Sequence, residues 1–172
     1  MFTIFTDASV NPKLKVGVGG YLILPDSFLQ KTPKQINKSI LNENIVLKKF
    51  QDTSSTKLEV QTVLWALSEY SIDPKYCNSD NFHIYTDSQC VEGLLPRRSR
   101  LESNDYHCKQ GDRLLKNASL YSKYYEFHDK FKFDVTKVEG HTRKRLRNTV
   151  QHIFSAIDQK VRKALKLWVL QL

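Results

Sequence analysis

Two stretches far apart in the chain resemble each other: Ile4-Phe5-Thr6-Asp7-Ala8-Ser9 and Ile84-Tyr85-Thr86-Asp87-Ser88-Gln89. Each is an alternating segment of strand character that ends in Thr-Asp. If the two strands lie side by side and parallel, both carboxylates emerge at the same edge of the sheet, where the sites of open α/β sheets collect. A turn or helix cap better explains either aspartate alone, but the matched pair favours a site.

Two adjacent carboxylates repel each other, and one tends to protonate unless a cation lies between them. Hard divalent cations with oxygen ligands, Mg²⁺ above all, are the natural partners of such a pair. Two further acids are candidates for the same place: Glu59 opens an expected helix, and Asp158 lies beside the apolar stripe of the last one. Each has an alternative explanation, because Thr56 and Glu59 fit a capping box and Asp158 can pair with Arg162.

The hydropathy pattern predicts the element order β-β-β-α-β-α-α-β-α. We expect strands at 2–7, 16–24, within 39–51, at 82–87 and at 133–138, and helices at 57–71, about 88–94, 110–130 and 149–169. Residues 26–38 form a polar connection and 95–108 a basic loop, and Gly17, Gly19 and Gly20 suggest a bulge or a close approach of another backbone. Early hairpins followed by strand–helix alternation imply a mixed sheet with helices on both faces.

Composition places the chain among ordinary folded proteins. Its 172 residues predict one domain over 1–172, and 40% hydrophobic residues exclude a disordered tail, a collagen-like chain and a coiled coil. The sequence has no run of 18 apolar residues, so we expect no membrane span, and residues 1–7 do not resemble a signal peptide. Cys77, Cys90 and Cys108 form an odd, sparse set. They fit reduced thiols, which favours a cytoplasmic protein.

The net charge of +9 is placed unevenly along the chain. Residues 1–86 carry +1 and residues 87–172 carry +8, and all eight arginines lie in the second part. Two dense clusters occur, at 97–100 and at 143–147. A basic folded domain suggests a polyanionic partner, although a solvated basic surface explains the charge alone equally well.

The ordered set Asp7, Glu59, Asp87 and Asp158 resembles the type 1 ribonuclease H family. The resemblance covers nearly the whole chain through six motifs: Thr6-Asp7-Ala8-Ser9, Gly17-Val18-Gly19-Gly20-Tyr21, Lys57-Leu58-Glu59, Tyr85-Thr86-Asp87-Ser88-Gln89, Val138-Glu139-Gly140-His141 and Asp158-Gln159-Lys160-Val161-Arg162. It implies a ribonuclease H-like α/β fold, with three antiparallel strands and then two parallel strands in one sheet, and helices on both faces. It also implies a metal-dependent endonuclease that cuts the RNA strand of an RNA–DNA hybrid.

The resemblance assigns roles to these residues. Two Mg²⁺ ions, or Mn²⁺ in their place, would clamp the attacking and leaving oxygens, with a metal-bound water as nucleophile. Asp7 would bridge the ions, Glu59 and Asp87 would complete one metal site, and Asp158 would help to hold the other. His141 would assist proton transfer or product departure.

Hybrid recognition is expected to use short polar side chains and basic residues, because phosphate contacts dominate affinity and 2′-hydroxyls mark RNA. The expected contacts are Ser9, Asn11, Ser55, Gln89, Arg97, Arg98, Arg100, Arg143, Lys144 and Arg145. The 17-residue gap from His141 to Asp158 is longer than in compact family members. The apolar end, Leu165 to Leu172, is expected to pack on the core of a monomer, with self-association through this segment as the alternative. A nuclease acting on DNA and a non-catalytic nucleic-acid-binding domain remain the alternatives.

Overall fold

The structure is a computed structural model that describes residues 1–76, 81–140 and 142–172. Its strands are β1 (Phe2–Asn11), β2 (Val16–Pro25), β3 (Val46–Gln51), β4 (His83–Thr86) and β5 (Asp134–Lys137). Its α-helices are α1 (Lys38–Asn44), α2 (Ser55–Ile72), α3 (Gln89–Glu92), α4 (Leu94–Ser103), α5 (Ala118–Phe131) and α6 (Thr149–Val169). Short 3-10 turns are η1 (Asp26–Gln30), η2 (Pro33–Gln35) and η3 (Lys144–Leu146).

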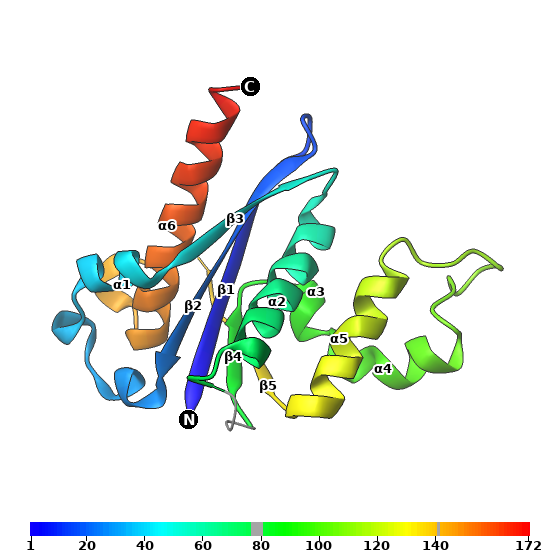
Figure 1. Cartoon of the computed structure of the whole chain (residues 1–172), viewed down its shortest axis with the longest axis horizontal. Helices are drawn as coiled ribbons and strands as arrows, with labels where there is room; N and C mark the ends of the chain where they lie inside the picture. Colours follow the sequence, from blue (N-terminus) through cyan, green and yellow to red (C-terminus); the bar gives the residue numbers. More distant parts are fainter. Residues whose placement is uncertain (77–80, 141) are drawn as a thin grey trace.

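The five strands form one mixed sheet in the order β3-β2-β1-β4-β5. The first three strands pair antiparallel, whereas β4 and β5 join β1 in parallel pairs. Figure 1 shows β1 as the long central strand with helices before and behind it. The predicted mixed sheet of three antiparallel and two parallel strands is confirmed.

Helices cover both faces of this sheet and create two cores. Helices α2 and α5 lie on one face, and α6 with α1 lies on the other (Figure 1). Alternate residues of β1 divide between them, because Ile4 belongs to the core under α2 and Phe5 to the core under α6. This alternation is the two-residue period of a strand that is buried on both sides.

The glycines of β2 let the helices approach the sheet from both sides. A Cβ on Gly19 would lie 2.3 Å from Oγ1 of Thr62 on α2, and one on Gly20 would lie 2.7 Å from Cγ2 of Val161 on α6. The pairing of β2 with β1 and β3 runs without interruption. The expected bulge is therefore absent, and the close approach at Gly19 and Gly20 is made by side chains and not by another backbone.

The connections contain more helix than the sequence predicts. The segment 26–38 holds η1, η2 and the start of α1, and the third strand occupies only Val46–Gln51. The expected loop at 95–108 is wrong, because α4 forms there on two buried leucines, Leu94 and Leu101, spaced seven residues apart. Pro96 falls in the first turn of that helix, where a missing N–H is tolerated.

The helix expected at 110–130 begins only at Ala118. Upstream of it, the Cys108 amide donates to the Arg113 carbonyl and the Leu115 amide donates to the Tyr106 carbonyl, each at 2.8 Å, so this segment folds back on itself. Gly111 has φ 145°, a conformation that is incompatible with a helix.

The end of α6 packs on the core only in part. Leu165 and Trp168 are buried, but Leu167, Leu170 and Leu172 are exposed, so the expectation that the whole apolar end is covered is wrong. Leu167 lies off the buried stripe of the helix, and Leu170 and Leu172 follow its last residue, Val169. Among the described residues, none of the helices has the length and apolar character needed to span a bilayer.

Candidate active site

Asp7 and Asp87 lie on neighbouring parallel strands. The register pairs Phe5 of β1 with Tyr85 of β4, so two residues further along each strand the aspartates reach the same level. Asp7 lies within β1 and is 6% exposed, whereas Asp87 directly follows β4 and is exposed. Neither side chain caps a helix, because the cap of α3 is Ser88. The structure thus places the echoed aspartates side by side.

Asp7 is a buried acid, and one of its carboxylate oxygens accepts no hydrogen bond from the described residues. Its Oδ2 atom is fully buried and has no hydrogen-bond partner among the described residues. Burial raises the pKa of Asp7 well above its usual range, and the charges of Asp87 and Asp158 raise it further. A buried carboxylate oxygen that faces two other acids is a position that a cation would stabilise.

Glu59 reaches the same region from α2 and is held there by a serine. The Ser88 hydroxyl donates to Glu59 Oε2 at 2.6 Å and accepts from the Val91 amide at 3.1 Å, so it links α2 to the start of α3. Burial raises the pKa of Glu59, the Ser88 hydrogen bond lowers it, and the charge of Asp87 raises it. The capping-box alternative is wrong, because α2 starts from Ser54 without a side-chain cap.

Asp158 approaches from α6, on the other face of the sheet. Its charge raises the pKa values of Asp7 and Asp87, so the three carboxyl groups interact. The predicted ion pair is also present, since Arg162 Nε donates to Asp158 Oδ1 at 2.8 Å. Arg162 is largely exposed, so the pair is weak and can exchange.

The four acids come from four different elements and form one electrostatic cluster. As the side chains stand, no three acidic, histidine or cysteine residues in the described parts of the chain are arranged to enclose a metal ion. The unpartnered Oδ2 of Asp7 and the all-oxygen donor set nevertheless fit a hard divalent cation. Asp7, Glu59, Asp87 and Asp158 are the residues that could hold it.

A polar pocket of about 160 Å³ opens beside Asp87 and Asp158. It is walled by the start of α6 and by the segment that follows β5. The lining side chains and backbone belong to Asp87, Val138, Glu139, Gly140, Thr142, Arg147, Gln151, Phe154, Ser155, Asp158 and Arg162. His141, the predicted proton-transfer residue, lies outside the described residues.

The predicted polar contacts follow β1 and the first turns of α2 and α3. Ser9 and Asn11 are half-buried on β1, while Ser55 and Gln89 are exposed as the first residues of their helices. Asn11 also has a structural part, because its Oδ1 accepts from the amides of the two residues that form the hairpin turn, Lys13 and Leu14, each at 3.1 Å.

The arginines of α4 are mostly engaged within the protein. Arg98 donates to Glu102 at 2.7 Å and to both oxygens of Asp129 at 2.6 and 2.8 Å, and these partners raise its pKa. Arg97 donates to the carbonyls of Gly93 and Cys90 at 3.0 and 3.1 Å. Arg100 alone of the three is exposed, with no side-chain partner among the described residues.

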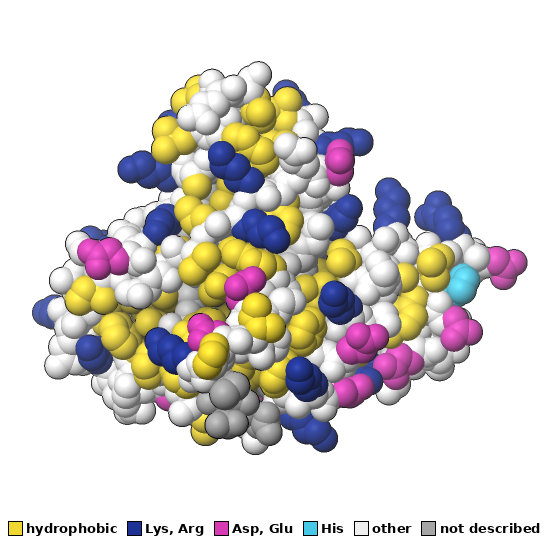
Figure 2. Space-filling view, in the orientation of Figure 1, with side chains coloured by type: hydrophobic (Ala, Val, Ile, Leu, Met, Phe, Trp, Pro, Cys, Tyr) yellow, Lys and Arg dark blue, Asp and Glu magenta, His cyan; other side chains and the backbone are white. Residues whose placement is uncertain are grey.

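The basic residues at 143–145, unlike the arginines of α4, are not engaged within the described parts of the protein. Arg143, Lys144 and Arg145 are exposed, and their side chains make no hydrogen bond or ion pair within the described chain. Figure 2 shows basic side chains spread over the α2–α5 face, with acidic ones gathered among them toward α4 and α5. Free positive charge is therefore a property of particular segments rather than of the whole surface.

The sequence pattern does not predict the part that two residues, Ser88 and Arg147, have in this site. Ser88 holds Glu59, and Arg147 lines the polar pocket, where it bonds to Thr142 and Ser155. Ser88 directly follows the second Thr-Asp pair, at a position where the first copy has Ala8, so the repeat gives no signal for it. The pattern of charges does not distinguish Arg147 from its neighbours.

Comparison with models of protein families gives a match over most of the chain. A search of curated protein sequences finds no counterpart of this chain. The family model for RNase H matches residues 1–157, which include Asp7, Glu59 and Asp87 and end one residue before Asp158. Because that match spans most of the chain and the sheet has the fold expected of the family, the protein belongs to the ribonuclease H family and is a ribonuclease H-like nuclease.

Proposed function

We propose that this protein is a metal-dependent endoribonuclease that hydrolyses the RNA strand of RNA–DNA hybrids. The observation that carries the proposal is the buried Oδ2 of Asp7, which has no hydrogen-bond partner among the described residues and belongs to a carboxyl group whose pKa is raised by the charges of Asp87 and Asp158. A protein of net charge +9 that concentrates negative charge at this point has a reason to do so only if cations join it.

Asp7 would be a ligand shared by two Mg²⁺ or Mn²⁺ ions, because its carboxyl group interacts with those of both Asp87 and Asp158. Glu59 and Asp87 would help to hold one ion, and Asp158 would help to hold the other. When bound, such ions supply charge stabilisation at the scissile phosphate and an activated water.

The chain's own groups orient these ligands. Ser88 holds Glu59 by a 2.6 Å hydrogen bond, which restricts the rotamers of the carboxylate. Arg162 Nε donates to Asp158 at 2.8 Å, and the arginine side chain is largely exposed, so it can move aside without disturbing the core. For His141, assistance to proton transfer or product departure remains the proposal.

Ser9, Ser55 and Gln89 support hybrid recognition, because short polar groups near the carboxylates suit contacts to 2′-hydroxyls in a wide minor groove. Arg100, Arg143, Lys144 and Arg145 are the exposed cations that suit phosphate contacts. The sparse cysteine content favours a cytoplasmic protein.

The deciding experiment is incubation with a labelled RNA–DNA hybrid, double-stranded RNA and double-stranded DNA, with and without Mg²⁺. We expect cleavage of the hybrid's RNA strand, only with the metal, and no cleavage by the Asp7→Asn variant. Cleavage of DNA with the hybrid left intact would identify a DNA nuclease, and hybrid binding without turnover in Mg²⁺ or Mn²⁺ would identify a non-catalytic binding domain. Either outcome would refute the proposal.

A further inference from the structure

The polar pocket beside Asp87 and Asp158 contains an arginine to which the proposed mechanism gives no role. Arg147 is half-buried; its Nε donates to the Thr142 carbonyl at 3.0 Å and its Nη1 donates to the Ser155 hydroxyl at 2.8 Å. Both acceptors are neutral, and no carboxylate of the described chain lies within ion-pair distance of this guanidinium. Its positive charge is therefore not compensated by a partner.

The anchors leave most of the guanidinium available. Of its five N–H donors, these two bonds use two. The remaining donors belong to a group that lines the pocket and whose orientation is restricted. A guanidinium group whose orientation is already fixed loses less conformational entropy when it binds a ligand. The planar arrangement of its N–H donors matches the oxygen atoms of a phosphate.

The other charges of the pocket identify the kind of anion that fits. Asp87, Asp158 and Glu139 also line it, and the second cation, Arg162, is paired with Asp158. A free anion would meet these carboxylates, so the pocket is unfavourable for inorganic phosphate. Cations bound by the acids would neutralise these carboxylates, so a phosphate on a strand held there would not meet that barrier, and about 160 Å³ has room for such a group with ordered water.

We infer that Arg147 binds a phosphate of the cleaved RNA strand next to the scissile one, and so fixes the register of that strand over the carboxylates. This inference rests on the proposed function and adds to it a specific subsite. The segment after β5 that carries Arg147 thereby contributes one oriented contact, distinct from the free charges of Arg143, Lys144 and Arg145.

The test uses hybrids in which one RNA linkage at a time, around the cleavage position, is a neutral methylphosphonate. Binding to the full-length wild type, Arg147→Gln and Ser155→Ala is measured by fluorescence anisotropy, with Ca²⁺ in place of Mg²⁺. We expect the wild type to lose about ten-fold in affinity at the linkage that Arg147 contacts. Arg147→Gln should lose about ten-fold on the unmodified hybrid and no more when that linkage is neutral, because the two changes remove the same interaction.

Ser155→Ala separates the charge from its anchor. It removes one hydrogen bond of Arg147 but keeps the guanidinium, so sensitivity to the same linkage should persist. If Arg147 only braced the loop, Ser155→Ala and Arg147→Gln would behave alike and weaken binding evenly over all linkages, which would overturn the inference. Melting curves identify any variant that fails to fold.

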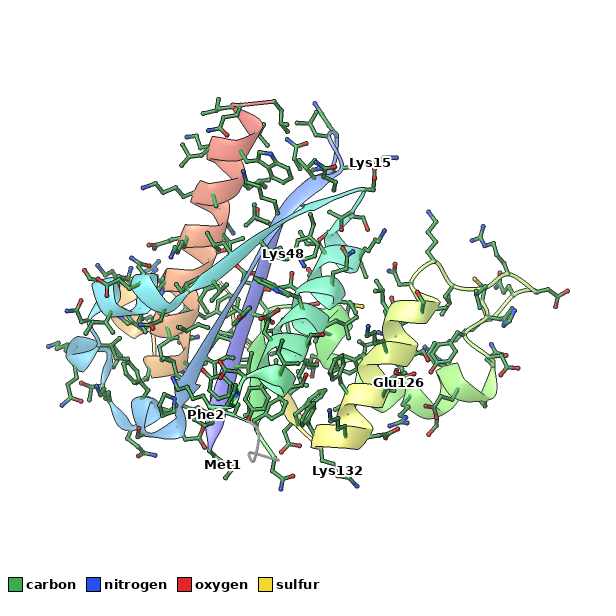
Figure 3. All side chains as sticks on the ribbon, viewed as in Figure 1. Met1, Phe2, Lys15, Lys48, Glu126 and Lys132 are labelled. Carbon is green, nitrogen blue, oxygen red and sulfur yellow. The ribbon has the colours of Figure 1, made fainter. Side chains whose placement is uncertain are left out.

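The matched charge control is Lys132→Asn. Lys132 directly follows the C-terminal end of α5 (Figure 3) and has φ 51°. Asparagine tolerates this conformation, so the change removes one positive charge without strain. It should keep the wild-type linkage pattern. Equal losses for wild type and Arg147→Gln at every linkage would refute the subsite. Failure of the wild type to cut unmodified hybrid in Mg²⁺ is read separately; it would refute the proposed function and, with it, the placement of the subsite.

Discussion

The carboxylate cluster and the arginine segments are both concentrations of one charge, but the fold treats them in opposite ways. The acids extend from central elements and meet where, among the described residues, only Asp158 has a cationic partner, so that burial and the charges of its neighbours raise the pKa of Asp7. The arginines of α4 lie at the periphery, where the fold supplies Arg98 with two carboxylates and Arg97 with carbonyls. Charge that the fold leaves uncompensated is better evidence of a ligand than charge that is merely abundant.

The same comparison separates the two arginine segments from each other. Arg97 to Arg100 and Arg143 to Arg147 look alike in sequence. Among the described residues, the first contributes one exposed cation without a side-chain partner and the second contributes three, together with the anchored Arg147. The number of arginines in a cluster therefore does not give the number that are free to bind phosphate.

The largest effect is expected from Asp7→Asn. The amide keeps the shape of the side chain but removes the charge at the centre of the cluster, so cleavage of the hybrid in Mg²⁺ should fall by about three orders of magnitude or more. Single-turnover cleavage with saturating protein measures this loss, and circular dichroism confirms the fold. Full activity of a folded Asp7→Asn protein would show that the cluster is not the reaction centre.

A smaller effect, on affinity rather than on chemistry, is expected from Arg145→Gln. Removing one phosphate contact should lower the slope of log affinity against log salt by about 0.9 and weaken binding a few-fold near 0.1 M salt. Turnover at saturating hybrid should not change, because Arg145 is not among the residues around the carboxylates. A fall in turnover with unchanged affinity and unchanged salt dependence would contradict the prediction that Arg145 acts in binding and not in cleavage.

These two predictions differ in how far the sequence alone supports them. The Asp7–Asp87 pairing was predictable, because parallel strands with the same motif must bring equivalent positions to one level. The support of Glu59 by Ser88 was not, since it joins two helices whose distance depends on tertiary packing. The capping box favoured for Glu59 rested on local spacing, and the tertiary contact prevailed.

The sequence also does not show which arginines are paired within the fold. Local sequence could not distinguish Arg98 from Arg100, because Asp129, which neutralises Arg98, lies 31 residues away. The ion pair between Arg98 and Glu102 also does not follow from a loop at 95–108, because residues four apart face each other only in a helix. Element order follows from hydropathy, but the use of each charge depends on contacts between elements.

Within α4, Arg98→Gln and Arg100→Gln form a matched pair that removes the same charge from one helix. Arg98 is committed to Glu102 and Asp129, so its loss should leave the salt dependence of hybrid binding unchanged and lower the Tm by no more than about 3 °C. Arg100→Gln should lower the salt slope without changing the Tm. A larger binding defect for Arg98→Gln than for Arg100→Gln would mean that the internal ion pairs open when the hybrid binds.

The smallest expected effect is a pH-dependent difference in Tm between Asp7→Asn and the metal-free wild type. The pKa of Asp7 is raised by burial and by its acidic neighbours, so between its ordinary and its raised value the folded state binds more protons than the unfolded state. The stability contributed by the protonated group is present below about pH 3.9 and is lost as pH rises through the raised value. Asparagine stays neutral, so the variant should gain a few degrees over the wild type toward neutral pH.

Thermal melts from pH 3.5 to 7.5 in chelator check this difference, with Glu126→Gln on an exposed face of α5 as the control for exchanging a carboxyl for an amide (Figure 3). Mg²⁺ should narrow the gap at neutral pH, because a bound cation stabilises the charged wild type and the variant has lost the central ligand. A gap that stays constant with pH would mean that the fold already compensates the charge of Asp7, as it does for Arg98. The two regions would then not differ in the way that marks the carboxylates as a cation site.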